Sequence, residues 1–232
     1  MEDDGDRSEK DVNIWGQAIA AVAVVAALGL ALMTLGETSS GESEPKAATC
    51  SGGESEKAEK AAGRVSGAQL CSVLNRRDLA ELLGTPTEIP KTASGGGGSV
   101  KMAGGREIPT PSAEVQFETY TVTLEGTYDG HPVGDTAALL GDTQKDRRFL
   151  GRRAVLYSDR TISIRFRLDG SDSSSGPGVP VRVLSVAQDA ADKGGSFELA
   201  LWREDGAVPD DTVLMQVAEQ VLPTIPGFSP HS

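Results

Sequence analysis

Residues 179–202 read VPVRVLSVAQDAADKGGSFELALW, in which two apolar runs are separated by a polar segment. Short runs rich in Val, Leu and aromatic residues, bounded by Gly, Asp and Gln, are typical of β-strands. We therefore predict strands over Val179–Ala187 and Phe197–Trp202, joined by the polar loop Gln188–Gly195.

The segment Val115–Tyr128 is dense in Val, Thr, Tyr and Phe and also predicts a strand. Its apolar residues change parity, because Val115 and Phe117 are at odd positions whereas Tyr120 and the apolar residues after it are at even ones. We expect either a β-bulge or a strand that is covered on both faces.

Residues 154–168 predict a hairpin with strands Ala154–Ser158 and Thr161–Leu168 and a turn at Ser158, Asp159 and Arg160. Apolar and polar side chains alternate in the second strand, as expected for one buried and one solvated face. The residues expected to face the core are Ile162, Ile164, Phe166 and Leu168, and those expected to face water are Ser163, Arg165 and Arg167.

Three helices are predicted around these strands. Ser66 and Gln69 match a capping box at the start of an apolar helical pattern, and Asp78–Gly84 repeats the same arrangement. A closing helix begins at Asp210 or Asp211 and ends at Pro223. Helices followed by strands and then a helix indicate an α+β domain with a mainly antiparallel sheet, packed with short N-terminal helices and a C-terminal helix.

An uncharged apolar segment near the N-terminus predicts a membrane anchor. Ile14–Leu35 contains 22 residues, which span ~33 Å as a helix and exceed the ~30 Å hydrocarbon core of a bilayer. The acidic residues before it and the length of the apolar run argue against a cleaved signal peptide. A lipoprotein site at Cys50 also fits poorly, because Cys50 lies well past the apolar run. We therefore predict an uncleaved signal anchor.

The positive charges beside the anchor favour one orientation. Arg7 and Lys10 precede the helix, whereas Lys46 is the only basic residue soon after it. By the positive-inside rule, the N-terminus is expected in the cytoplasm and the C-terminal domain outside, on a single-pass protein of the cell membrane. The expected organisation is an acidic cytoplasmic tail (1–13), a transmembrane helix (14–35), a disordered linker (36–63), an extracytoplasmic domain (64–228) and a frayed tail (229–232).

Two segments have the composition of flexible chain. Gly36–Gly63 is rich in Gly, Ser, Glu, Lys and Ala and shows no apolar periodicity, which is typical of a solvated tether. Ser94–Ser99 contains four consecutive glycines, and we expect it to be a flexible connection between helices and strands.

Cys50 and Cys71 are the only cysteines. If the domain lies in an oxidising compartment, the two thiols are expected to form a disulfide between the tether and the first helix, worth ~3 kcal/mol. The alternative is a buried Cys71 beside a free Cys50. No metal site is expected, because the two cysteines lack CxxC spacing and the histidines are few.

Charge and motifs exclude several functions. The chain carries 22 basic and 34 acidic residues, so we expect no nucleic-acid binding. His131 in a turn and His231 near the C-terminus are the only histidines, and no nucleophile elbow accompanies them. We identify no catalytic residue and no cofactor site, although a pair of carboxylates could escape sequence reasoning.

One cluster of basic residues is a candidate binding site. Five of them lie within nine residues, and two more lie on the strand expected beside them: Lys145, Arg147, Arg148, Arg152, Arg153, Arg165 and Arg167. Such a patch would suit an anionic envelope polymer or a lipid head group. The alternative is a solvated hairpin whose arginines pair with neighbouring acids and protect an edge strand.

Four stretches resemble an actinobacterial family of membrane-anchored proteins of unknown function. They are Val65–Cys71, Asp78–Gly84, Leu156–Ile164 and Gly194–Glu198, and the likeness runs from the anchor to the C-terminal helix. A cysteine on an opening helix followed by Asp-Leu-x-x-Leu-Leu-Gly is also similar to actinobacterial envelope lipoproteins and extracytoplasmic kinase sensor domains. Neither resemblance implies a catalytic residue.

These observations together predict a membrane-anchored extracytoplasmic domain that binds or senses at the cell envelope and is not an enzyme. Its partners would be the membrane, through Ile14–Leu35, and an anionic envelope polymer, a lipid head group or a membrane protein. The alternatives are a carboxylate-based envelope hydrolase and a structural or assembly subunit of a membrane complex.

Overall fold

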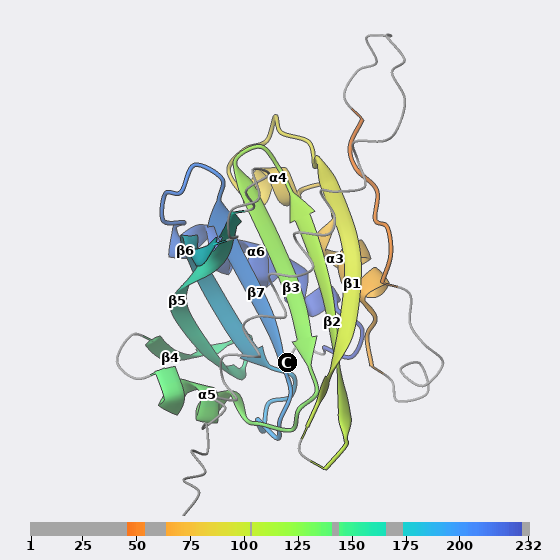
Figure 1. Cartoon of the computed structure of the whole chain (residues 1–232), viewed down its shortest axis with the longest axis vertical. Helices are drawn as coiled ribbons and strands as arrows, with labels where there is room; N and C mark the ends of the chain where they lie inside the picture. The colour runs from red at the N-terminus through yellow and green to blue at the C-terminus, as the bar shows by residue number, and fades with distance from the viewer. Residues whose placement is uncertain (1–45, 54–63, 103, 141–143, 166–173, 229–232) are drawn as a thin grey trace, which may run out of the picture. The chain divides into compact units, whose positions relative to one another are not determined.

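The computed structural model describes residues 46–53, 64–102, 104–140, 144–165 and 174–228 (Figure 1). All of them belong to one compact unit, Glu42–Ser232. The predicted membrane anchor, Ile14–Leu35, lies outside the described residues. Within the described residues, no helix is both long and apolar enough to span a bilayer.

A seven-stranded, fully antiparallel sheet forms the domain, in the order β1-β2-β3-β7-β6-β5-β4. The strands predicted over 179–202 become β6 and β7 and lie near the middle of this sheet. The bounds are β1 (Thr92–Lys101), β2 (Glu107–Gln116), β3 (Tyr120–Thr127), β4 (Gln144–Phe149), β5 (Arg152–Arg165), β6 (Ser174–Ala187) and β7 (Ser196–Arg203).

The helices are short and lie mostly on one face of the sheet. Helix α3 (Gly67–Leu74) contacts β1, β2 and β3, and α6 (Asp211–Val221) contacts β6 and β7, while α4 (Leu79–Leu82) packs on α6. Figure 1 views the sheet from the opposite side, with α3 and α6 behind it. Helix α5 (Val133–Leu140) instead contacts β4, β5 and β6, and the 3-10 turn Leu222–Thr224 follows α6.

Both predicted helix caps that open α3 and α6 are confirmed. The Ser66 Oγ accepts from the Gln69 backbone N–H at 3.2 Å, and the Gln69 side chain accepts from the Ser66 N–H at 2.9 Å. The Asp210 carboxylate accepts from the Thr212 N–H at 2.7 Å. These side chains satisfy N–H groups that the first turn of a helix leaves without backbone partners.

The core lies between these helices and one face of the sheet. Its fully buried side chains come from alternate positions of the central strands and from the inner sides of the helices. They include Leu70, Leu74, Leu79, Val122, Leu124, Leu156, Leu184, Leu199, Leu201, Leu214 and Val221. Each buried side chain of this size contributes roughly 1.5–3 kcal/mol of hydrophobic stabilisation.

The parity change predicted within 115–128 has a different cause from the one expected. The segment is not one strand with a bulge but two strands, β2 and β3, joined by a tight turn in which the Phe117 N–H donates to the Tyr120 carbonyl at 2.7 Å. The turn reverses the chain, so that Val115 faces Val122 across the two strands on the helix-covered face.

The glycine-rich segment Ser94–Ser99 was expected to be a flexible connection, and this is wrong, because it is the middle of β1. A Cβ on Gly67 would lie 1.8 Å from the Gly96 carbonyl oxygen, so the start of α3 rests directly on the backbone of β1. Glycine is therefore required there by the close approach of two backbones.

The hairpin expected at Ser158, Asp159 and Arg160 is also wrong, because β5 continues through these residues. A register shift between Arg160 and Ile162 marks an irregularity that changes the parity of the strand. Ile162 and Ile164, expected in the core, are 38% and 39% exposed. Phe166, Arg167 and Leu168 lie outside the described residues.

The end of the predicted linker belongs to the folded unit. The Ala48 N–H donates to the Pro90 carbonyl at 2.9 Å, and Ser51 makes a parallel bridge with Ser94 of β1. The structure also pairs Cys50 with Cys71, whose Cα atoms are 5.9 Å apart, which confirms the expected proximity of the two cysteines. Residues 46–53 are thus held against α3 and β1 instead of forming part of the tether.

The fold class is confirmed at the level of a mainly antiparallel sheet with a few short helices, which can be described as α+β or as mostly β. The sequence did not predict α5 or β4, and β1 was predicted as a connection.

Candidate functional site

The face of the sheet opposite α3 and α6 carries a row of polar side chains. The cross-strand register places Ser112 of β2 beside Glu125 of β3, Glu125 beside Glu198 of β7, and Glu198 beside Ser185 of β6. Side chains of directly opposed residues in antiparallel strands lie on the same face with Cβ atoms ~5 Å apart. Two glutamates therefore meet at the middle of the sheet.

The neighbouring rows extend this polar surface, which we call the polar face. It consists of Ser112, Glu114, Thr121, Thr123, Glu125, Tyr157, Ser185, Glu198 and Trp202. These residues come from five strands, β2, β3, β7, β6 and β5. The polar face is thus created by long-range strand pairing and not by any local motif.

The environment of the two glutamates disfavours their charged forms. Burial, and then the charge of Glu198, raise the pKa of Glu125 from 4.5 to about 7. Burial also raises the pKa of Glu198, although a hydrogen bond from Tyr157 opposes this shift. Burial, followed by the charge of Glu204, raises the pKa of Glu114 on the neighbouring strand. Near neutral pH the central pair can therefore hold a proton.

Tyr157 connects β5 to the pair. Its hydroxyl donates to the Glu198 Oε2 at 2.9 Å. Burial, and then the carboxylate of Glu198, raise the pKa of Tyr157, so the phenol keeps its proton. The hydrogen bond fixes the position of the Glu198 carboxyl group relative to the sheet.

Three hydroxyl-bearing residues of the polar face are largely buried. Thr121 is 2% exposed, Thr123 is 7% exposed and Ser185 is 3% exposed. The Thr121 hydroxyl donates to the Glu204 Oε1 at 2.5 Å. Thr123 and Ser185 add hydroxyls to the polar face that can both donate and accept.

The structure divides the predicted basic cluster between the two faces of the sheet. Arg147 lies on the helix-covered side, where its Nη1 contacts the Met215 sulfur at 3.4 Å. Arg148 and Arg153 are opposed to each other on the other face, and both are exposed. The side chains of Lys145 and Arg165 and all of Arg167 lie outside the described part.

Arg152 is a structural residue. It is 3% exposed, donates to the carbonyls of Ala187 and Gln188, and places its guanidinium 4.0 Å from the centre of the Phe228 ring. Burial lowers its pKa, and the charge of Asp189 opposes that shift. Arg152 therefore joins the end of β6 to the C-terminal segment and is not available to an external ligand.

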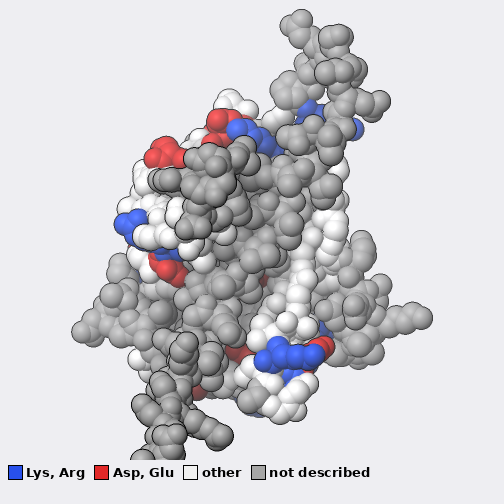
Figure 2. Space-filling view, viewed as in Figure 1, with Lys and Arg blue, Asp and Glu red and all other residues white. Residues whose placement is uncertain are grey.

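The charged residues that the structure describes on the displayed side of the domain are dispersed (Figure 2). Figure 2 shows small, separate basic and acidic groups among its described residues. Salt bridges explain part of this distribution, since Lys91 pairs with Glu118, and Arg203 pairs with Asp205 at 2.5 Å.

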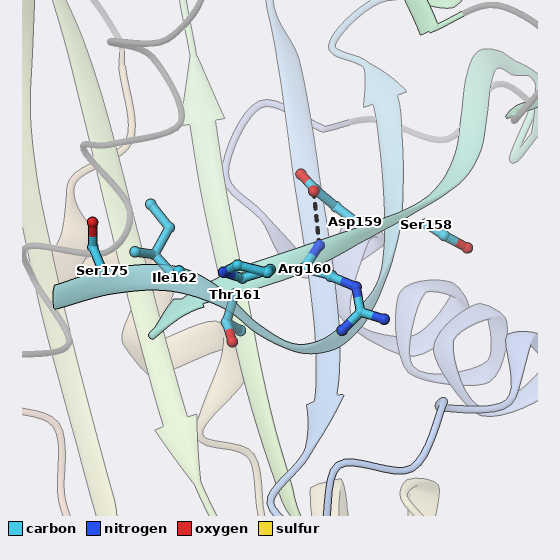
Figure 3. A pocket seen from close by; sticks show the side chains of 8 residues that line it. Ser158, Asp159, Arg160, Thr161, Ile162 and Ser175 are labelled. Carbon is cyan, nitrogen blue, oxygen red and sulfur yellow. Dashed lines mark hydrogen bonds between the residues drawn. The ribbon is translucent and has the colours of Figure 1, made fainter. Parts of the chain in front are cut away.

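A shallow groove lies where β5 and β6 extend past their neighbours. It has a volume of about 620 Å³, is open to solvent, and is lined by Ser158, Asp159, Arg160, Thr161, Ile162, Ser175, Gly176 and Pro177. Figure 3 shows Asp159 and Ile162 on one side of β5 and Thr161 on the other, as the irregularity after Arg160 requires. Asp159 accepts a hydrogen bond from the Arg160 backbone N–H at 2.7 Å. The groove is lined by one acidic residue, Asp159, and one basic residue, Arg160.

The described residues contain no group of three or more His, Cys, Asp or Glu side chains that could hold a metal ion. Glu125, Glu198 and Tyr157 were not predicted from the sequence as site residues. The signal that pointed to them is an acidic residue inside an apolar strand, as in Val122-Thr-Leu-Glu125 and Phe197-Glu-Leu-Ala200.

Comparison with known proteins identifies a family but no function. Residues 9–143 match the model of DUF6215, which is described as a family of unknown function. No curated protein and no solved structure matches the chain.

Proposed function

The chain belongs to DUF6215, a family of unknown function, and we propose that it is a single-pass membrane protein whose C-terminal domain binds an envelope ligand on the polar face without catalysis. The observation that carries the proposal is the Glu125–Glu198 pair at the centre of a sheet face that also carries the hydroxyls of Thr123 and Ser185.

The chemistry of the polar face favours a hydroxyl-rich ligand with little negative charge. Hydroxyls at Thr123 and Ser185 both donate and accept, and a glutamate that holds a proton donates as well. Trp202 on the same face offers a flat apolar surface beside these groups. A glycan strand of the cell envelope presents the matching alternation of hydroxyls and apolar C–H faces. An anionic polymer or lipid head group fits less well, because the centre of the polar face is acidic.

The membrane location rests on the uncharged segment Ile14–Leu35 and on the charges beside it. Because residues 46–53 are part of the folded unit, only residues 36–45 would separate that segment from the domain. Ten residues have an r.m.s. reach of ~17 Å as a flexible chain, so the domain would remain close to the bilayer.

A sedimentation assay tests the ligand. The full chain, purified in detergent, is mixed with insoluble envelope glycan, and bound and free protein are compared for wild type, Glu198→Gln and Ser185→Val. Glu198→Gln exchanges the carboxyl group for a neutral amide of similar size, and Ser185→Val replaces the hydroxyl with apolar methyl groups, so we expect weaker binding. Glu118→Gln is the matched control, because Glu118 is an exposed acid outside the polar face. Equal binding of all four proteins, or no binding, would refute the proposal.

A second assay tests the topology. Protease is added to intact cells that carry a C-terminal tag on the chain. An extracytoplasmic domain predicts loss of the tag without lysis, whereas a tag that survives until lysis would place the domain in the cytoplasm.

One observation favours a second function, the carboxylate-based hydrolase. A glutamate with a pKa near 7 beside another carboxyl group resembles the acid and base that such enzymes use. The glycan assay separates the two functions if the supernatant is also tested for new reducing ends. Reducing ends that disappear in Glu125→Gln would favour the hydrolase, and binding without product would favour the binding domain.

A further inference from the structure

The strands β1 and β2 extend beyond the rest of the sheet as a two-stranded ribbon. They pair from Thr92 and Gln116 as far as Lys101 and Glu107, but β2 pairs with β3 only over Ser112–Gln116. Among the described residues, the outer half, Gly97–Lys101 with Glu107–Pro111, therefore has no neighbouring strand on either side (Figure 1). An open strand presents unpaired N–H and C=O groups at every second residue.

The hydrogen bonds of Ser51 show which residues of β1 point outward. The Ser51 N–H donates to the Ala93 carbonyl at 3.3 Å, and the Gly95 N–H donates to the Ser51 carbonyl at 2.7 Å. Because strand groups alternate with a period of two, the outward groups of the outer half belong to Gly97, Ser99 and Lys101. All three residues are exposed.

The open side of β2 is blocked, unlike that of β1. The odd-numbered residues of β2 point toward β3, as in the pair Ala113–Leu124, so Pro109 and Pro111 occupy the outward positions beyond the end of β3. Proline has no N–H and is a common protection of strand edges. At the opposite edge of the sheet, β4 has the charged sequence QKDRRF, which also discourages pairing.

The outer half of β1 has neither protection. Its sequence, Gly97-Gly-Ser-Val-Lys101, contains no proline and only one charge. The inner half of the same edge is already occupied by an extended segment, since Ser51 pairs there in parallel. That segment turns away at Gly52 and Gly53, both of which have a positive φ. The open edge therefore continues an existing site of strand addition.

We propose that the outer edge of β1, Gly97–Lys101, binds an extended peptide segment of a partner protein as an additional strand. Val100 is 38% exposed on one face of the ribbon, and Lys101, which forms an exposed salt bridge with Glu107 of β2 at 3.4 Å, lies on the other. A strand beside them would carry an apolar side chain next to Val100 and an acidic one next to Lys101. The partner segment is thus proline-free and has an apolar residue next to an acidic one. Main-chain hydrogen bonds provide most of the affinity when a peptide adds to a sheet edge in this way.

This interaction is independent of ligand binding on the polar face. Peptides are selected from a random dodecapeptide phage library against the full chain in detergent, and their affinity is measured for wild type, Ser99→Pro and Ser99→Thr. Proline at this outward position removes one N–H and obstructs the incoming strand without removing a bond to β2. We expect a roughly tenfold or larger loss for Ser99→Pro, and little change for Ser99→Thr, which keeps the donor.

Amide hydrogen exchange of wild type with and without a selected peptide gives a second readout that does not depend on folding of the variants. Strand addition should slow exchange of the outward amides of Gly97, Ser99 and Lys101 and leave Gly98 and Val100 unchanged. Protection without this alternation would overturn the proposal, as would peptides that bind equally to Ser99→Pro or a library that yields none. A dimer that forms without peptide and is lost in Ser99→Pro would assign the edge to a second copy of the chain instead.

Discussion

Glu125 on β3 and Glu198 on β7 are direct cross-strand partners on the polar face of the sheet. Like charges in directly opposed positions destabilise a sheet, so ionising both carboxylates would destabilise the pairing of β3 with β7. A shared proton relieves the repulsion, which agrees with the raised pKa of both groups. The Tyr157 hydroxyl favours the charged form of Glu198, so we expect the proton to reside mainly on Glu125.

This pair predicts a specific dependence of stability on pH. The pKa of Glu125 is about 7 in the folded chain and close to 4.5 when unfolded. The folded state therefore holds the proton more tightly, and its stabilisation is complete below pH ~4.5 and is lost as the pH rises to ~7. Allowing for partial solvent exposure, we expect a loss of roughly 2–3 kcal/mol.

The comparison of wild type with Glu125→Gln isolates this effect from other titrating groups. Urea unfolding of both proteins is measured between pH 4 and 8, a range of about four units around the two pKa values. The stability of wild type relative to the variant should decrease through this window, whereas Glu118→Gln should show no such trend. A difference that stays constant with pH would contradict the raised pKa.

The polar face illustrates which features the sequence can predict. The strands that carry Glu198 and Ser185 are recognisable from their apolar residues. The prediction matches β7 to within one residue at each end, but it misses the first five residues of β6. Their neighbours in the sheet were not predictable, because register between distant segments depends on the whole sheet and not on local periodicity. Glu125 and Glu198 are 73 positions apart in the chain, by subtraction of their numbers, and only the β3–β7 pairing brings them together.

Arg152 provides a second prediction, which separates structural from exposed arginines. Arg152→Ala removes two hydrogen bonds to backbone carbonyls and the contact with the Phe228 ring, so we expect a loss of roughly 2–4 kcal/mol in the free energy of unfolding. Arg148→Ala, on the exposed side of β4, should change it by less than ~0.5 kcal/mol. Equal effects measured by urea unfolding would show that burial of Arg152 is unimportant.

Because Arg152 is buried and Arg148 is exposed, the arginines of the predicted basic cluster should not be substituted together in a binding test. Neutralising Arg147, Arg148, Arg152 and Arg153 together would also destabilise the chain through Arg152, so a loss of binding could not be assigned to the exposed arginines. The sequence could not separate them, since the strand pairing of β4 with β5 decides which face each one occupies. Whether Arg148 and Arg153 bind an anionic ligand stays a prediction, to be measured with anionic vesicles and Arg148→Gln with Arg153→Gln.

Gly67 and Gly98 form a matched pair for a third prediction. Gly67→Ala would force a Cβ into the backbone of Gly96, whereas a Cβ on Gly98 meets only the Thr110 side chain at 3.7 Å. We expect Gly67→Ala to lower the midpoint of thermal unfolding clearly, because α3 must move away from β1, and Gly98→Ala to have little effect. Similar midpoints for the two variants would show that the helix and strand are not in close contact.

The glycine-rich strand explains one error of the sequence analysis. Consecutive glycines are usually a sign of flexible chain, since they pack no side chains and gain the most entropy on unfolding. In β1, Gly95 and Gly96 are instead explained by the close approach of Gly53 and Gly67. An added Cβ on Gly53 would lie 2.7 Å from the Gly95 carbonyl carbon, and one on Gly67 would lie 1.8 Å from the Gly96 carbonyl oxygen. Such a contact between distant segments leaves no periodic pattern in the sequence.

The Cys50–Cys71 pair gives the last prediction, because it helps to hold residues 46–53 on the domain. The pair closes a loop with a sequence separation of 21, and a disulfide that closes a loop of this length contributes ~3 kcal/mol. Reduction, or Cys50→Ser with Cys71→Ser, should therefore lower the urea midpoint of unfolding. It should also free residues 46–53 from β1 and speed proteolysis at Lys46. The double variant should not respond to reductant, and Ser51→Ala, which alters the same segment without touching the thiols, should behave as wild type. Oxidised and reduced wild type that unfold at the same urea concentration would show that the β1 bridge and the Ala48 hydrogen bonds hold the segment without the disulfide.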